Sequence, residues 1–440
     1  MAASDSTAQP NALSQLIDAR PITAVQLFVI ALCAASMIVD GYDIQVMALA
    51  VPTLSRSWAL PPASFELALS AIVIGISLGS GLLGPLADRF GRRTLLTLGM
   101  LAAGIATLCT ASSSSLTQFV LWRTLTGLAM GAAIPSCAAL TSEYAPLPHR
   151  SLAMSLINIG PPIGAFAAGF IAPPVLEAFG WRGTFLIGGA APLLIAGVAL
   201  FVPESLKFML TRRPSDPRIA RYLRRLAPDV EPASVYMPAS ANPPRASPLA
   251  LLNRTYRART MLLWGLVGLN LFNLYVLVSW LPTILEQSGW SAAGAIRGAV
   301  LIQAGGVVGG LTMSRFLDRG ATKAAMVTGF TLAAVCMALF AVLPSGPWWV
   351  LLLLLTGVGV SGSQTSVNAL SAAYYPPAIK ATGVSWALLI GGIGSIIGPI
   401  AGGRLISWGL SPTAIVALLA IPSLACALGA AVSRREWQAD

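Results

Sequence analysis

Long apolar stretches separated by short polar segments run through almost the whole chain. A helix needs about 20 apolar residues, within a range of roughly 17–25, to cross the hydrocarbon core of a bilayer. Twelve stretches of this size predict spans at residues 25–51, 66–87, 94–112, 118–139, 152–174, 184–203, 260–284, 298–314, 324–343, 348–370, 382–403 and 412–432. Because lipid cannot satisfy backbone N–H and C=O groups, we predict an all-α polytopic membrane protein with twelve transmembrane helices.

The longest polar stretch divides the predicted spans six and six. We therefore expect an N-terminal tail, a six-helix bundle, a central loop, a second six-helix bundle and a C-terminal tail, at residues 1–24, 25–206, 207–258, 259–433 and 434–440. Within the loop, Ile219–Leu226 has the pattern of a basic amphipathic helix, lying either on the inner leaflet or in a solvated linker. The first 24 residues contain no apolar core before a cleavage site, so we expect no cleaved signal peptide.

The composition supports the membrane assignment and explains the basic charge. The chain is 56% hydrophobic and 10% charged, whereas soluble domains carry about 25% charged residues. The net charge is +11, and the basic residues gather on the side that holds both predicted termini: Arg20, Arg89, Arg92, Arg93, Arg150, Arg315, Arg319, Lys323, Lys380, Arg434, Arg435 and those of the central loop. This asymmetry predicts cytoplasmic termini in a bacterial inner membrane, with anionic lipid rather than nucleic acid as the partner of the charge.

Two aspartates, Asp40 and Asp43, lie inside the first apolar stretch. A carboxylate buried in a bilayer costs at least about 2.5–3.5 kcal/mol, so such residues are usually functional. They share one helix face and repel each other when both are ionised, which favours a site for a proton, a cation or a substrate. This feature predicts a transporter.

Arg123 is the only basic residue within a predicted span. It lies at the same depth as Asp43, roughly 8 Å from the midplane at about 1.5 Å per residue, so we expect an Asp43–Arg123 ion pair. Asp40 lies one turn deeper and is the better candidate for reversible protonation, because burial and its charged neighbour both disfavour its ionised form.

The two halves repeat with an offset of 230 residues. Asp88-Arg89 recurs as Asp318-Arg319, and Asp40 and Asp43 correspond to Asn270 and Asn273. Parallel repeats predict two bundles related by a pseudo-twofold axis, with substrate bound between them at the midplane. We infer proton handling in the first half and neutral substrate contacts in the second. The alternative is that these asparagines hold helices together, for about 0.6 kcal/mol each.

Further polar and aromatic residues lie within the spans of the second half. A group of amide and aromatic side chains suits a ligand with a flat apolar body and polar ends. The candidate substrate contacts are Asn270, Asn273, Tyr275, Gln303, Gln364, Asn368 and Trp386. The chain has one histidine, His149, and no visible nucleophile–base pair or metal cluster, so we expect no enzyme and no cofactor other than the proton.

The loop Gly84–Arg93 (GPLADRFGRR) resembles the Gly-x-x-x-Asp-Arg-x-Gly-Arg-Arg motif of the major facilitator superfamily, which implies a cytoplasmic gate. Asp88 can accept from arginines and from a helix N-terminus, and Gly84 and Gly91 permit close backbone approach. The gate candidates are Gly84, Asp88, Arg89, Gly91, Arg92, Arg93, Glu143, Arg150, Asp318 and Arg319.

From Asp40 to Arg404 the chain resembles the aromatic acid:proton symporter family of this superfamily. The resemblance is carried by Asp40-Gly41-Tyr42-Asp43, the gate loop, Ser142–Pro146, Pro203-Glu204-Ser205, Trp280-Leu281-Pro282 and Tyr375–Trp386. It implies proton-coupled uptake of a benzoate or hydroxybenzoate and a proton-coupling role for the two acids. We expect the symporter to work as a monomer by rocker-switch alternating access.

The chain departs from the family pattern at two positions. Gly392 stands where family members commonly have an arginine, and Lys380 replaces an arginine. We hypothesise that protonation of the aspartate pair frees Arg123 to attract the substrate anion. The alternatives are a carrier of another organic anion, a drug or metabolite exporter, and a membrane sensor that moves nothing.

Overall fold

A computed structural model of the protein describes residues 18, 21–212, 216–226, 251–344, 346–375 and 377–432. The side chains of some residues inside these ranges, Asp318 and Lys380 among them, lie outside the description. The predicted C-terminal tail, most of the N-terminal tail and the middle of the predicted central loop also lie outside it.

Long helices account for nearly all of the described chain, which contains no strand. They are α2 (Ala24–Trp58), α3 (Glu66–Leu82, after the 3-10 turn η1, Pro62–Phe65), α5 (Arg92–Ala111), α6 (Leu116–Tyr144), α7 (Leu147–Ala199), α10 (Arg257–Gln287), α11 (Ala292–Asp318), α12 (Thr322–Val342), α13 (Trp348–Tyr374), α14 (Pro377–Ser407), α15 (Pro412–Leu418) and α16 (Ala420–Val432). Eleven continuous helical stretches in the described part are long and apolar enough to cross a membrane, with α15 and α16 forming one of them.

The helix α7 contains two spans rather than one. Its 53 residues would extend about 80 Å, far more than a bilayer core. The backbone leaves the helical region at Gly180, where φ is 64° and ψ is −170°. Glycine has no Cβ and adopts this conformation without strain, so it allows the chain to reverse between the two spans. Dividing α7 at Gly180 gives the twelve spans predicted from the sequence.

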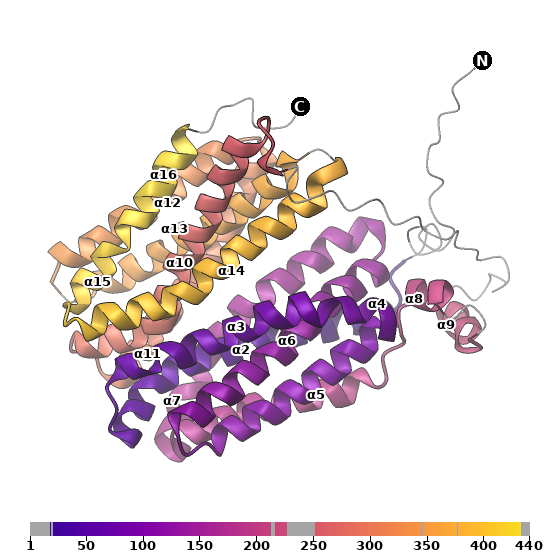
Figure 1. Ribbon diagram of the computed structural model, residues 1–440, viewed down its shortest axis with the longest axis horizontal. Helices are drawn as coiled ribbons and strands as arrows, with labels where there is room; N and C mark the ends of the chain where they lie inside the picture. Colours follow the sequence, from indigo (N-terminus) through magenta and orange to yellow (C-terminus); the bar gives the residue numbers. More distant parts are fainter. Residues whose placement is uncertain are drawn as a thin grey trace.

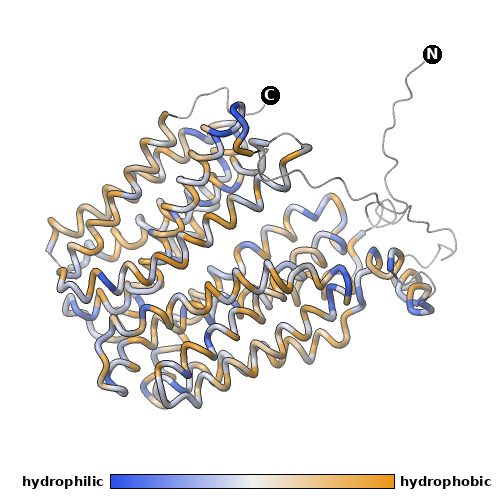
Figure 2. Tube along the Cα trace, in the orientation of Figure 1, coloured by the Kyte–Doolittle hydropathy of each residue, from blue (hydrophilic) through white to orange (hydrophobic). Residues whose placement is uncertain are grey.

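The helices form two bundles that lie side by side. In Figure 1 the bundle of α2 to α7, drawn from indigo to pink, lies against the bundle of α10 to α16, drawn from red to yellow. Figure 2 shows hydrophobic residues along the helices of both bundles. Large apolar side chains such as Phe170, Leu194 and Leu311 are 62%, 71% and 67% exposed. In a membrane protein such side chains contact lipid.

Close helix contacts repeat at the predicted offset of 230 residues. A Cβ atom on Gly127 would lie 2.1 Å from the carbonyl oxygen of Ile72, and a Cβ on Gly357 would lie 2.1 Å from that of Ile302. Glycine therefore allows α3 to approach α6, and α11 to approach α13, at equivalent positions. The internal repeat is therefore present in the helix packing as well as in the amino-acid sequence.

Short helices gather at one end of the N-terminal bundle. They are η2 (Gly84–Leu86), α4 (Ala87–Phe90), α8 (Leu206–Arg212) and α9 (Arg218–Leu226). The predicted amphipathic helix is α9, and its Ile219 and Leu223 pack against Phe208 and Met209 of α8. Its apolar face is thus covered by protein, which favours the linker interpretation over insertion into the inner leaflet.

Candidate functional site

Asp43 of α2 and Arg123 of α6 form the ion pair that their matching depth predicts. Arg123 Nη1 lies 2.9 Å from Asp43 Oδ1, and Nη2 donates to the Asp43 main-chain oxygen at 3.0 Å. The ring of Phe185 lies 5.4 Å from the guanidinium carbon. Both charged residues have 0% exposure. The guanidinium is therefore enclosed and committed to Asp43.

This enclosure bears on the hypothesis that Arg123 attracts the substrate anion. With no exposed surface, the guanidinium has no face available to a ligand. Separating it from Asp43 would leave a buried charge without a partner, which costs about 3–5 kcal/mol. The structure therefore favours a fixed structural pair.

Asp40 differs from its neighbour. It keeps 5% exposure and forms no ion pair among the described residues, whereas Asp43 is held by Arg123. Its Oδ1 is buried without a hydrogen-bond partner in the described part of the chain, as is Oδ2 of Asp43. The titratable groups in electrostatic reach are Asp43, Arg123 and Cys137, with Tyr275 from the second bundle. Buried polar atoms nearly always have a partner, so this oxygen is a candidate position for binding a proton or for contacting a ligand.

Three predicted substrate residues form a chain of amides in the second bundle. Asn270 Nδ2 donates to the Val360 carbonyl at 3.1 Å and to Gln364 Oε1 at 2.8 Å. Gln364 Nε2 in turn donates to Asn368 Oδ1 at 2.9 Å. Asn368 is exposed, whereas Asn270 Oδ1 is buried and has no partner among the residues that the structure describes. The chain links α10 to α13 and leaves acceptor and donor capacity for a ligand.

Gln303 of α11 joins the two halves, because its Nε2 donates to Gln45 Oε1 of α2 at 3.4 Å. Gln45 Nε2 is itself buried, with no hydrogen-bond partner in the described part of the chain. Gln45 was not among the predicted residues. A single glutamine in an apolar span gives no signal of its own, since only the arrangement of the helices brings it to Gln303.

Asn273 and Trp386 do not join this group. Asn273 Nδ2 donates to the Leu419 carbonyl at 2.9 Å and to Ser423 Oγ at 2.8 Å, so it connects α10 to α15 and α16. Trp386 stacks on Trp264 within the second bundle, with ring centroids 5.8 Å apart. Both contacts correspond to helix packing, the alternative considered for the asparagines.

Glu204 holds the predicted gate loop together. It accepts from the backbone N–H of Arg93 at 2.9 Å and of Thr94 at 3.4 Å, at the N-terminus of α5. Gly91, with φ 108°, approaches it so closely that a Cβ would lie 2.3 Å from Glu204 Oε2. We expected Asp88 in this capping role. Its side chain is instead 67% exposed and pairs with Arg92 at 2.8 Å.

The rest of the predicted gate also ties this loop to the end of the sixth span. Arg92 lies 3.7 Å from Glu143, which accepts from the Ser205 hydroxyl, and it covers the Phe208 ring at 5.5 Å. The other contacts are Arg93 with the carbonyls of Ala199 and Leu200, Arg89 over the Phe90 ring, Gly84 against Pro135, and Arg150 with Asp18 and Ala145. Arg319 follows the end of α11, and the side chain of Asp318 lies outside the description.

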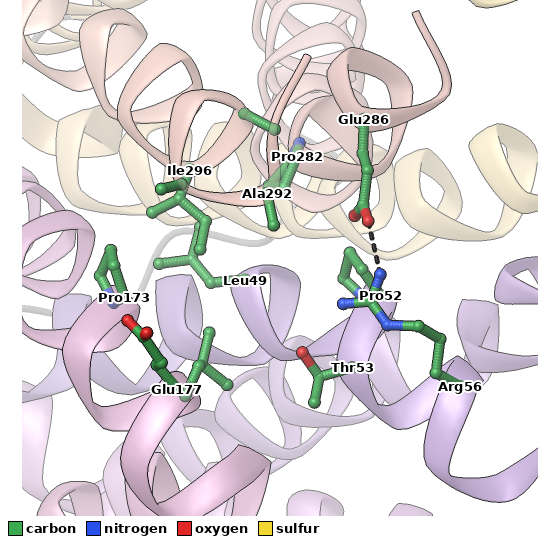
Figure 3. Close-up of a pocket in the computed structure, with 13 residues that line it drawn as sticks. Leu49, Pro52, Thr53, Arg56, Pro173, Glu177, Pro282, Glu286, Ala292 and Ile296 are labelled. Carbon is green, nitrogen blue, oxygen red and sulfur yellow. Dashed lines mark hydrogen bonds and ion pairs between the residues drawn. The ribbon is translucent and has the colours of Figure 1, made fainter. Parts of the chain in front are cut away.

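The opposite end of the bundles, which we call the latch end, carries two ion pairs between the halves. Arg56 Nη1 lies 2.6 Å from Glu286 Oε1, and Arg404 Nη2 lies 3.3 Å from Glu66 Oε1. Figure 3 shows the first pair beside a cavity of about 320 Å³ between the halves. Apolar side chains such as Leu49 and Ile296 line it with Glu177 and Thr53. Sequence reasoning did not identify these contacts.

The halves meet along two flanks at equivalent positions of the repeat. On the α3–α14 flank Ser70 donates to the Ile396 carbonyl at 2.9 Å, close to the Glu66–Arg404 pair. On the α7–α11 flank the equivalent of Ser70 is Val300, which packs so closely on Gly169 that a Cβ there would lie 2.0 Å from Val300 Cγ2. The contacts named on the first flank are therefore polar, and the one on the second flank is apolar.

Gly392 of α14 also faces the other half, since a Cβ on it would lie 3.4 Å from Ser77 Oγ of α3. An arginine at this position would extend between the two bundles. Its absence leaves Arg123 as the only basic residue in the interior of the described helices.

Two bundles of six spans with an internal repeat and an acid at their interface define a secondary transporter. The family model of the Major Facilitator Superfamily matches residues 33–353 and 263–436. The chain belongs to this superfamily. The solved inward-open structure of the xylose transporter XylE from E. coli covers 92% of this chain and 96% of its own, with TM-score 0.73 and 17% identity, which supports the fold.

The sequence relatives agree with the predicted resemblance to aromatic acid carriers. The chain is 34% identical over 441 residues to the 4-hydroxybenzoate transporter PcaK of Acinetobacter baylyi, covering 97% of this chain and 96% of the relative. It is 32% identical over 415 residues to the gallate transporter of Pseudomonas putida, covering 94% and 92%. These matches confirm a transporter rather than an enzyme.

Proposed function

We propose that the protein imports an aromatic carboxylate of the benzoate or hydroxybenzoate class together with protons. The observation that carries this proposal is Asp40, a buried acid within electrostatic reach of Tyr275 of the second half and beside the enclosed Asp43–Arg123 pair, with an oxygen that has no partner among the described residues. Relatives that span nearly the whole chain and are named for 4-hydroxybenzoate and gallate support the substrate class. The proton is the coupling ion, and no other cofactor is needed.

Rocker-switch alternating access fits the contacts between the halves. In the described residues, the ion pairs that join the halves both lie at the latch end. The positive-inside asymmetry supports an orientation with this end outside, both termini in the cytoplasm and the protein in a bacterial inner membrane. The described state then corresponds to a carrier closed toward the outside. We propose that it works as a monomer embedded in anionic lipid.

Uptake into vesicles tests the function directly. Purified protein in proteoliposomes should accumulate labelled 4-hydroxybenzoate or gallate when the outside is made acidic, and a protonophore should abolish accumulation. Asp40→Asn should remove the gradient dependence. Asp216→Asn, the same chemical change in the segment before α9, is the matched control and should transport normally.

Other outcomes would replace the proposal. Gradient-independent uptake by the wild-type protein would contradict proton coupling. Expulsion of a lipophilic cation without aromatic-acid uptake would indicate an exporter, and uptake of a non-aromatic carboxylate alone would indicate another anion carrier. Ligand binding without any accumulation would indicate a sensor.

A further inference from the structure

We propose that the proton and the substrate share one hydrogen bond, in which the neutral carboxylic acid of Asp40 donates to the carboxylate of the bound aromatic acid. This inference rests on the proposed function and extends it. It assigns to Asp40 a direct contact with substrate, and it makes coupling a property of one site.

The first argument is that the described interior offers no free cation to the anion. Arg123 has no exposed surface, and both of its terminal nitrogens already donate to Asp43. Gly392 occupies the position at which a second cation could extend between the bundles. A carboxylate must therefore be met by neutral hydrogen-bond donors.

The second argument is that Asp40 has an oxygen to offer. Its Oδ1 has no partner among the described residues. Asp43 also has an unpartnered oxygen, but it is held by Arg123 and has no exposed surface, whereas Asp40 forms no ion pair in this part of the chain and retains 5% exposure. Tyr275, on the facing helix α10, lies within electrostatic reach. The protonated form of a carboxylic acid is a donor, whereas the ionised form only accepts. Only the protonated form of Asp40 can bind a carboxylate.

The third argument concerns the groups around Asp40. On α2 and α6 the charges of Asp43 and Arg123 offset each other at 2.9 Å. Cys137 of α6 and Tyr275 of α10 are neutral groups at pH 7 when unperturbed. On the α7 side, the next residue, Gly41, packs against the backbone of Pro161. An ionised Asp40 would thus add an uncompensated negative charge and repel the substrate anion.

The order of events follows from this arrangement. The proton must bind Asp40 before the anion, and the anion then stabilises the protonated form. Exchange of one substrate molecule for another across the membrane needs no proton release, because Asp40 can stay protonated throughout. Net accumulation requires the proton to leave on the inside after the substrate.

The test measures substrate affinity against pH on the purified full-length protein. Isothermal titration with 4-hydroxybenzoate between pH 6 and 8.5 should show wild-type affinity falling by up to about tenfold per pH unit once Asp40 loses its proton. Asp40→Asn carries a permanent neutral donor of the same shape. It should bind within about threefold of the wild-type affinity at low pH, with no pH dependence. Asp40→Ala should lose at least about tenfold.

Transport separates binding from coupling. In proteoliposomes, Asp40→Asn should exchange labelled for unlabelled substrate at a rate within about threefold of wild type, but should show no accumulation driven by a pH gradient. Asp40→Ala should do neither. Infrared difference spectra of the wild-type protein supply a readout that does not depend on a variant folding, since substrate should shift the stretching band of a protonated carboxyl group.

Three results would overturn the inference: Asp40→Asn losing as much affinity as Asp40→Ala, Asp40→Asn keeping the wild-type pH slope, or substrate leaving the infrared carboxyl band unchanged. Failure of the proposed function would look different. In that case the wild-type protein would bind no aromatic carboxylate at any pH.

Discussion

Arg56 and Glu286 form an ion pair at 2.6 Å and stand 230 positions apart, the offset of the internal repeat. They are therefore the same position in the two halves. Residues on a twofold axis meet their own equivalents, as in the isologous interface of a dimer. A repeat with identical residues here would place like charges together. Here the two equivalent positions carry opposite charges, so the contact is attractive. This is possible only because the two halves have diverged in sequence at this position.

Reversing one charge of this pair should weaken the closed latch end. Arg56→Glu places two acids together and should lower the equilibrium constant for closure of the latch end by about fivefold, since an exposed pair contributes up to about 1 kcal/mol. Electron spin resonance distances between labels at Ser57 and Gln287 would measure the population. The double exchange Arg56→Glu with Glu286→Arg should restore it, and no recovery would show that the pair does not act as a latch.

Removing one partner of the enclosed pair should destabilise the protein strongly. Asp43→Leu leaves Arg123 as a buried charge without a partner and should cost about 3–5 kcal/mol, visible as a much lower unfolding temperature in detergent. The double variant Asp43→Leu with Arg123→Met should recover part of this loss. Asp88→Asn, at the 67% exposed carboxyl, is the control and should change the temperature little. Equal losses of thermal stability in Asp43→Leu, the double variant and Asp88→Asn would contradict the assignment of Asp43 and Arg123 as a buried structural ion pair.

Gly91 should tolerate no side chain. Its φ of 108° and ψ of 147° lie in a region that is essentially restricted to glycine and costs other residues about 1–3 kcal/mol. An added Cβ would also displace Glu204 from the N-terminus of α5. Gly91→Ala should therefore lower thermal stability. Gly81→Ala is the matched control, because a Cβ there would meet no atom within 4 Å in a helix. It should be neutral or slightly stabilising, so similar effects at the two sites would refute the explanation.

Gly392→Arg should change the way in which substrate is held. The arginine would enter the space between the bundles opposite Ser77 and offer a permanent cation to the anion. We expect 4-hydroxybenzoate affinity to become less dependent on pH than in the wild type, measured by isothermal titration. Gly392→Gln adds a neutral side chain with similar polarity and should keep the wild-type pH dependence. An unchanged slope in Gly392→Arg would contradict this account.

Most of the fold could be predicted from the sequence because span length is set by bilayer thickness. Apolar run length therefore gave the twelve spans, and the polar stretch after Ser205 gave the division into halves. The turn at Gly180 shows the limit of this reasoning. The sequence predicts a break between the fifth and sixth spans, but not that a single glycine outside the helical region provides it.

The site was predictable only where depth decides a contact. Asp43 and Arg123 could be matched because rise per residue fixes their height in the membrane. Asn270 and Asn273 could not be separated in this way, since their heights are similar and helix rotation decides which neighbour each one meets. The roles of Glu204 and Arg56 depend on which helix ends lie next to each other in the fold. No local sequence pattern predicts this arrangement.

The unequal flanks of the latch end have a mechanical consequence. Salt screens exposed ion pairs, whereas apolar contacts do not weaken in this way. High ionic strength at the latch end should loosen the α3–α14 flank and leave the contact between Val300 and Gly169 intact. The halves would then separate first between α3 and α14, while α7 and α11 stay in contact and the halves rotate about that contact. A carrier built from a symmetric repeat would in this way move asymmetrically.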